Sequence, residues 1–203
     1  MGYVDQLIEI HRKLQQGQGR RHEQDAIHRA GVVMVVAAWE GYVEKVLLEA
    51  LTAIERDAGI VAGAPVPAGL PAWTRHTFGI RRTELVNALK QFNTPNAQNV
   101  QRLMREWMQF DPFPAWSWHV KARQWDTAEM QKRANQWLNI RHGIAHGSGL
   151  PTDIQWMQDA QHRPRLTLTL LKECKRFFER LVQQTDDSFR VFLQVTHGVA
   201  APW

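Results

Sequence analysis

The sequence predicts an all-α fold, an antiparallel helical bundle built around one long central helix. Apolar residues recur at three- and four-residue spacings over most of the chain, as on one face of a helix. The segment from His22 to Asp57 contains no proline and includes a nearly continuous apolar run, Val32 to Ala38, which is typical of a buried helix. No repeat or composition shift marks a boundary, so we expect residues 1–203 to form a single domain.

The composition favours a cytoplasmic protein with a polyanionic partner. Lys and Arg number 25 against 20 Asp and Glu, and the formal net charge is +5. One cysteine, Cys174, excludes a disulfide framework within the chain. The N-terminus carries Asp5 and Glu9 and lacks the order of a signal peptide. The longest strongly apolar run, Gly31 to Trp39, is about half the length needed to span a bilayer, so we expect no membrane insertion.

The first half of the chain predicts four helices. Tyr3 to Gln16 carries an apolar stripe that ends before two glycines, and the central helix follows over His22 to Asp57. Gly59 to Pro71 is rich in Ala, Gly and Pro, which predicts a surface loop. Helices are then expected over Arg82 to Phe92 and Pro95 to Gln109, the latter with Thr94 as its N-cap and Pro95 at its first position.

The second half predicts an irregular connection followed by two helices. Phe110 to Trp125 is aromatic-rich and has no clear period. Asp126 and Glu129 have the spacing of a capping box, so a helix should run from Thr127 to about His142. A last long helix is expected over Thr167 to Thr196, although alternation in Arg163 to Thr169 leaves a short strand open there.

The chemistry-bearing stretch is Asn139-Ile-Arg-His-Gly-Ile-Ala-His-Gly147, at a predicted helix end. His142 and His146 are four apart, but Gly143 stands where a zinc protease needs its glutamate. No nucleophile elbow, phosphate-binding loop or Cys/His cluster is present. What remains is an arginine with a histidine, the minimum for cleaving RNA without metal. A histidine moves the protons, and an arginine holds the scissile phosphate.

Helix geometry sets a condition on this pair. Arg141 and His146 are five residues apart, so they lie about 140° apart around a regular helix. They converge on one phosphate only if the helix bends near Gly143 or if a second subunit completes the site.

The stretch resembles the signature of HEPN domains, an arginine, a polar residue, three further residues and a histidine. Arg141, His142 and His146 match its three positions, and Ile144 to Gly147 resembles the usual tail. Ala37 to Lys45 is similar to the early helix of prokaryotic HEPN proteins of the RiboL-PSP type.

This resemblance implies a bundle of four to five helices that dimerises so that the two motifs face one cleft. Such proteins typically cleave single-stranded RNA without a metal or other cofactor, leaving 2′,3′-cyclic phosphate and 5′-hydroxyl ends. They often serve as toxins or phage-defence effectors, which implies a cognate antitoxin or regulatory partner. Arg141 would bind the phosphate, His146 would act as general acid or base, and His142 would orient one of them. Glu40 and Asn139 are assigned supporting roles beside the motif.

Simpler interpretations remain open for several of these residues. Arg141 and His146 could be basic residues that meet the dipole of a helix end, and Glu40 could be a solvated glutamate. An aromatic and basic set near one irregular segment is compatible with base stacking, although tryptophans are more often core residues. Its members are Trp116, Trp118, Lys121 and Arg123.

Two further functions also stay open. The bundle could be a non-catalytic dimerisation or nucleotide-binding module that acts with a nucleotidyltransferase-like partner, because a fold does not fix a function. Alternatively, a partner could modify the motif to silence a nuclease.

Overall fold

The computed structural model describes residues 2–14, 24–60, 72–92, 94–120 and 123–203, and its regular structure is almost entirely helical. The long helices are α1 (Gly2–Leu14), α2 (Asp25–Asp57), α3 (Ala72–Lys90), α4 (Ala97–Met108), α5 (Thr127–Ala145) and α6 (Leu168–Phe192). Short helical turns occupy η2 (Phe113–Ala115), η3 (Gln155–Met157) and the π-helical η4 (Leu193–His197), and β1 (Trp118–Val120) pairs with β2 (Arg123–Trp125). The predicted all-α class is confirmed.

Helix α2 is the centre of the core, as the sequence predicts. Residues facing different directions around it, among them Val35, Val36 and Trp39, are at most 1% exposed. It lies close to α6 at Gly31, where a Cβ would come within 2.6 Å of the Leu171 side chain. The glycine therefore allows the two longest helices to pack against each other directly.

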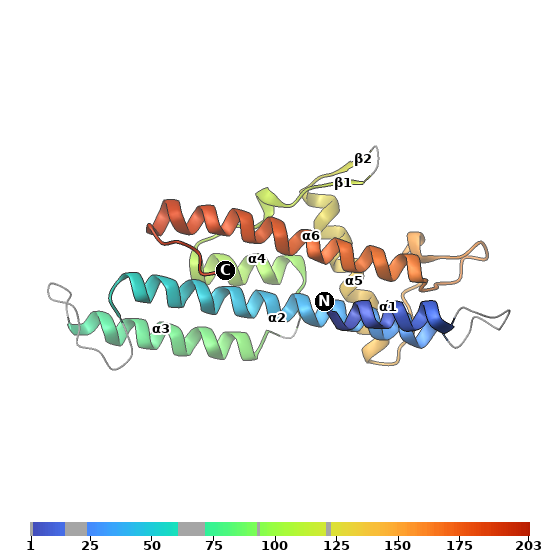
Figure 1. The fold of residues 1–203 in the computed structure, drawn as a ribbon, viewed down its shortest axis with the longest axis horizontal. Coiled ribbons are helices and arrows are strands. Elements are labelled where there is room, and N and C mark those ends of the chain that lie inside the picture. Colours follow the sequence, from blue (N-terminus) through green and yellow to red (C-terminus); the bar gives the residue numbers. More distant parts are fainter. Residues whose placement is uncertain (1, 15–23, 61–71, 93, 121–122) are drawn as a thin grey trace.

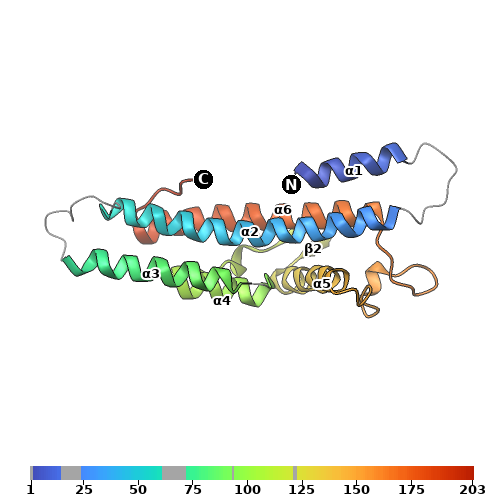
Figure 2. The ribbon, with the colours of Figure 1, turned by 90° about the horizontal axis from the view of Figure 1, so that it is seen from below.

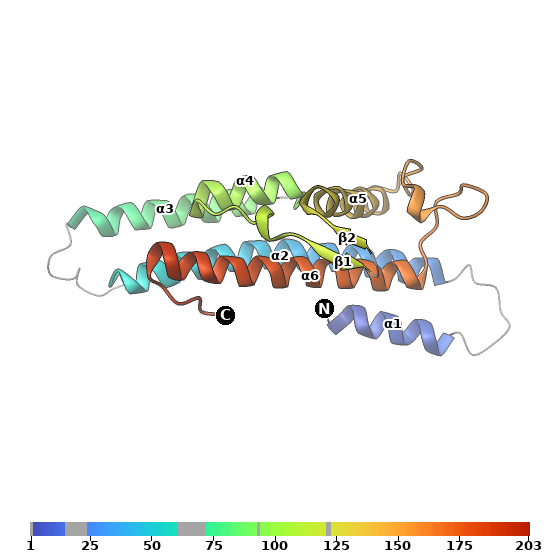
Figure 3. The same ribbon diagram turned by 90° about the horizontal axis from the view of Figure 1, so that it is seen from above.

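Helices α2 and α6 lie side by side along the molecule, with α1 against one end of the pair (Figures 1 and 2). Helices α1 and α3 run antiparallel to α2, whereas α6 runs parallel to it (Figure 1). Helix α5 crosses the others and is seen nearly end-on in Figure 3. This crossing returns the chain to the end of the molecule where α2 begins, which gives α6 the direction of α2.

The predicted capping signal was correct for α5 and wrong for α4. Asp126 and Glu129 form the predicted capping box, and Thr167 caps α6. Helix α4, in contrast, is capped by Asn96, whose side chain accepts a hydrogen bond from the Asn99 amide, so Thr94 is not the cap. The Pro95 carbonyl accepts a hydrogen bond from the indole Nε1 of Trp39, 56 residues away, which holds Pro95 outside the helix.

One other helix boundary differs from the sequence predictions. Helix α3 begins at Ala72 rather than Arg82. The sequence did not indicate this earlier start, because residues 76–81 are mostly exposed and carry little apolar pattern. The predicted loop from Gly59 to Pro71 falls almost wholly outside the described residues. Residues 163–169 form no strand, because only an isolated bridge joins Gln158 to Pro164 and the chain then enters α6.

The aromatic-rich connection is more ordered than the sequence predicts, since it contains the η2 turn and a β-hairpin. Trp118 and Trp125 face each other across the hairpin, with ring centroids 5.7 Å apart. Trp116 is fully buried, and its Nε1 donates a hydrogen bond to the Thr185 hydroxyl. Within the part of the chain described, no helix combines the length and apolar character needed to cross a membrane.

Candidate active site

The motif lies on the last turn of α5, which is anchored by its opposite face. Met130, Trp137 and Ile140 are fully buried, and α5 packs across α2. This anchoring leaves Asn139, His142 and His146 exposed, while Arg141 is half-buried on the side of α2.

Helix α5 does not bend at Gly143. It is α-helical through Ala145, and the His146 amide donates to the His142 carbonyl at 3.0 Å. Gly143 is buried instead because the chain folds back over it, so that a Cβ there would clash with the Gly149 carbonyl oxygen. The glycine serves this close approach of the returning loop. The bend that would bring Arg141 and His146 together within one chain is therefore absent.

His142 and His146 form one exposed surface. Their rings are 4.4 Å apart between centroids and inclined at 48°. His142, Gly143 and Asn139 line a cavity of about 540 Å³ together with residues 148–153 of the returning loop. A ligand that enters this cavity meets the histidine face of the helix. Among the described residues, no group of three metal-ligating side chains gathers.

Arg141 lies on the other side of the turn, close to Glu40 of α2. Its Nε is buried and has no hydrogen-bond partner among the described residues. Burial raises the pKa of Glu40, the positive charge of Arg141 acts in the opposite direction, and Glu44 raises it further. No hydrogen bond or ion pair joins Glu40 to Arg141 in the described part of the chain, and Arg141 acts on the Glu40 carboxyl through its charge.

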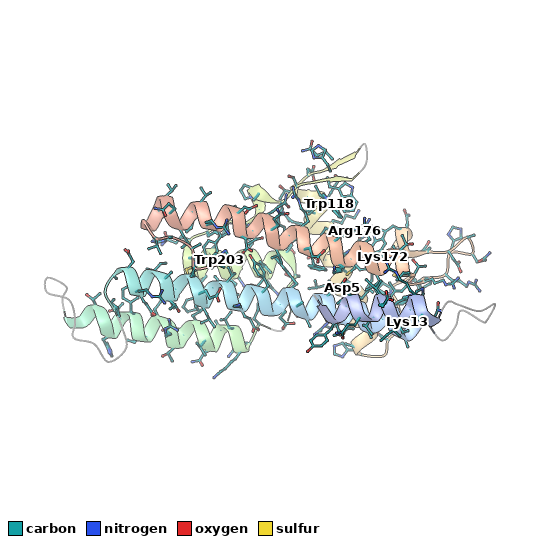
Figure 4. The ribbon with its side chains drawn as sticks, in the orientation of Figure 1. Asp5, Lys13, Trp118, Lys172, Arg176 and Trp203 are labelled. Carbon is teal, nitrogen blue, oxygen red and sulfur yellow. The ribbon has the colours of Figure 1, made fainter. Side chains whose placement is uncertain are left out.

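The predicted aromatic and basic set does not form a single surface. Trp116 is a core residue and cannot stack on a base in this structure, which corrects that prediction. Trp118 is half-buried where the hairpin meets α6 (Figure 4), with its ring 6.1 Å from that of Phe177. Lys121 and the side chain of Arg123 lie outside the described residues.

A second cavity, which the sequence gave no reason to expect, opens on α5 and is lined by Trp125 and Trp156. Trp125 belongs to the hairpin and Trp156 to the short η3 turn, so they are far apart in the chain. No local pattern connects them. A larger cavity than the one beside His142 thus opens on the same helix.

Comparison with protein families concerns the first part of the chain. The RiboL-PSP-HEPN family model matches residues 3–65, which include α1 and α2. This match places residues 3–65 in the HEPN superfamily. The matched region contains the segment Ala37 to Lys45 that resembles this type. Neither the curated proteins nor the solved structures returned a match.

The HEPN match ends before the motif on α5. Residues 139–147 lie outside the matched range, so the match and the motif are separate observations. They meet in space, because the charge of Arg141 in the motif acts on Glu40 in the matched part. Helix α2, which the family model matches, therefore lies close to Arg141.

Proposed function

We propose that this HEPN protein is a metal-independent endoribonuclease that cleaves single-stranded RNA. One observation carries the proposal: Arg141, His142 and His146 occupy the end of a helix packed on the HEPN helix α2, with both histidines exposed. The alternative of a simple helix-end pair does not account for Arg141, because its Nε is buried and has no hydrogen-bond partner among the residues that the structure describes. A buried unsatisfied donor costs about 1–3 kcal/mol, which favours a functional reason for its placement.

The reaction follows from the chemistry of these side chains. A histidine takes the proton of a ribose 2′-hydroxyl, and the 2′-oxygen attacks the neighbouring phosphorus. The bond from phosphorus to the 5′-oxygen breaks, and the leaving oxygen receives a proton. The products are a 2′,3′-cyclic phosphate and a 5′-hydroxyl. Arg141 donates two hydrogen bonds to the phosphate and stabilises the charge that develops on it.

A homodimer completes the site in this proposal. Within one chain, α5 is regular and directs Arg141 and His146 to different sides. A two-fold axis near the end of α5 would bring Arg141 of one protomer toward His146 of the other. Each of the two symmetry-related sites would then combine Arg141 of one protomer with His142 and His146 of its partner, and these two histidines can supply the base and the acid that the reaction requires.

The biological role that we propose is that of a toxin or phage-defence effector held in check by a cognate antitoxin or another regulatory protein. An enzyme that cuts cellular RNA without a metal ion has no cofactor through which it can be restrained. Restraint must then come from a partner or from chemical modification of the site.

The test is cleavage of single-stranded RNA in excess EDTA, with analysis of the product ends. Wild type should give cyclic-phosphate ends, and Arg141→Ala and His146→Ala should each lower the rate at least about 100-fold, since one acid–base group contributes that much. Arg176→Ala, on α6 (Figure 4), and His119→Ala, on the hairpin, remove exposed residues of the same types and should leave the rate unchanged. If the wild-type protein is a folded dimer but does not cleave the RNA, the result would favour the binding-module function instead.

A further inference from the structure

The larger cavity on α5 has the size of a binding site for a small flat ligand. Its volume is about 600 Å³, within the range of ligand pockets. Trp125 and Trp156 supply aromatic walls, and Lys132 and Gln136 of α5 reach it from the helix. Neither the motif nor the HEPN match includes these residues.

The aromatic walls are held in place by their own partners. The Arg133 guanidinium lies 3.9 Å from the ring centroid of Trp156 and 4.8 Å from that of Trp125. Arg133 also pairs with Glu173 at 3.2 Å, and the Trp156 Nε1 donates to the Gln136 side chain at 2.7 Å. Side chains fixed in this way lose little entropy when a ligand binds. The cavity is preorganised.

The lining favours a nucleobase over a phosphate. The cavity is lined by two carboxylates, those of Asp153 and Glu129, and by two cations, Lys132 and Arg133. The charge of Arg133 is balanced in part by its ion pair with Glu173. Carboxylates repel a phosphate, whereas a base is neutral and presents donors and acceptors along its edge. Amide and carboxylate groups can bind that edge, and the guanidinium and indole groups of the lining can contact its faces.

This cavity lies next to the proposed catalytic site on the same helix. Asp153 lines both the larger cavity and the one beside His142. Lys132 and Gln136 lie on the same face of α5 as Asn139, at helical spacing, and His142 follows one turn later. Ten residues of helix separate Lys132 from His142, about 15 Å, which about two or three unstacked nucleotides span.

We propose that the cavity between Trp125 and Trp156 binds an unpaired base of the substrate RNA, about two or three nucleotides from the scissile phosphate. The inference rests on the proposed ribonuclease function, and it makes this cavity a determinant of where the RNA is cut. The base enters the cavity beside the Arg133 guanidinium, which lies over both indole rings, while its backbone follows the α5 face toward His142.

The test uses a 2′-O-methyl oligonucleotide with one ribonucleotide, so that only one bond can be cleaved. Abasic sites are placed one at a time along the strand, and kcat/KM is measured for each. Loss of the bound base should lower kcat/KM roughly 5- to 100-fold at one position, since stacking contributes about 1–3 kcal/mol per base. Trp156→Ala should lower kcat/KM on the intact strand and abolish the effect of that abasic site.

A matched control separates binding from packing. Trp107→Ala removes another half-buried indole that lies under an arginine, Arg81, at 4.1 Å, away from α5. Asp153→Ala changes an exposed residue of the cavity and should fold normally. Asp153→Ala should weaken the abasic effect, and Trp107→Ala should not. Equal abasic effects at every position, or the same effects in the Trp156 and Trp107 variants, would overturn the proposal.

A fully 2′-O-methylated strand, which cannot be cleaved, distinguishes this proposal from the catalytic one. If the wild type binds that strand with the same abasic dependence but cleaves no RNA, the base site stands and the ribonuclease function fails. If it cleaves RNA but binds all abasic strands equally, the ribonuclease function stands and the base site fails.

Discussion

At the scale of single residues, the end of α5 combines exposed histidines with a constrained arginine. His142 and His146 face solvent, whereas Arg141 is half-buried beside the raised-pKa carboxyl of Glu40. An exposed imidazole can exchange protons with water and substrate, as an acid–base catalyst must. A half-buried guanidinium has a restricted orientation, which suits a phosphate-binding group.

Gly143→Ala tests the packing that supports this arrangement. The added Cβ would overlap the Gly149 carbonyl oxygen, which is backbone and cannot swing away. We expect a loss of about 1–3 kcal/mol in the free energy of unfolding, as for other overpacked sites. RNA cleavage should also fall, because His146 leads directly into the displaced loop. Urea unfolding and the EDTA cleavage assay measure the two effects.

Gly79→Ala is the control for helix propensity. Gly79 is exposed in the interior of α3, and a Cβ there meets no atom within 4 Å. It should therefore raise the free energy of unfolding by up to about 1 kcal/mol. If Gly143→Ala proved as stable as Gly79→Ala, the close approach of the loop would not matter.

The residues of the candidate site can be proposed from the sequence, but the packing around them cannot. Arg141, His142 and His146 were found from residue chemistry and from the resemblance, and their angular separation follows from a regular helix. The reason for Gly143 could not be found, because the Gly149 carbonyl reaches it only through the path of the loop. The burial of Trp116 could not be predicted either, because its partner Thr185 is distant in the sequence and no local pattern indicates the contact.

At the scale of elements, α1 is joined to the bundle by a buried polar contact. His28 Nε2 and His11 Nδ1 are 3.1 Å apart, and the two residues are 6% and 3% exposed. Burial lowers the pKa of both; Lys172 lowers that of His11 further, and His11 lowers that of His28. Asp5 of α1 also pairs with Lys175 of α6 at 2.9 Å.

These histidines should make the stability of the fold depend on pH. Because their pKa values are lower in the folded chain, the unfolded chain binds more protons at mildly acidic pH. Their contribution is fully present above about pH 6.5, the unfolded value, and is lost as the pH falls toward the folded values. A His11→Leu/His28→Leu variant should therefore lose less stability than wild type between pH 7.5 and pH 5.

Urea unfolding at a series of pH values measures this difference. His28→Leu alone leaves His11 Nδ1 buried without its partner, so it should cost about 1–3 kcal/mol at pH 7.5. His119→Leu replaces an exposed histidine and should keep the pH dependence of wild type. An unchanged slope in the double variant would show that the pair does not link protons to folding.

Helices with local start signals could be predicted from the sequence, and elements fixed by distant contacts could not. The capping box placed α5 correctly, since both of its partners lie within four residues. The start of α4 was misplaced because Trp39, far away in the chain, holds the Pro95 carbonyl. The hairpin was missed because strands of three residues are too short to show alternation.

At the scale of the whole molecule, α2 connects the part that matches the HEPN family with the part that carries the motif. The match covers α1 and α2, and the motif stands at the end of α5, which crosses α2 (Figure 1). The exposed end of α5 is then free to meet a second copy of the chain. Helices α2 and α6 form the core, and the end of α5 carries the candidate catalytic residues.

The central claim is that each active site takes Arg141 from one protomer and His146 from its partner. It is tested most directly by mixing the inactive variants Arg141→Ala and His146→Ala, with subunit exchange followed by mass spectrometry. Random exchange gives heterodimers in which one of two sites is intact, so about a quarter of wild-type activity should return. If heterodimers form and activity stays at the level of either variant alone, while the wild type cleaves RNA, the shared site is contradicted.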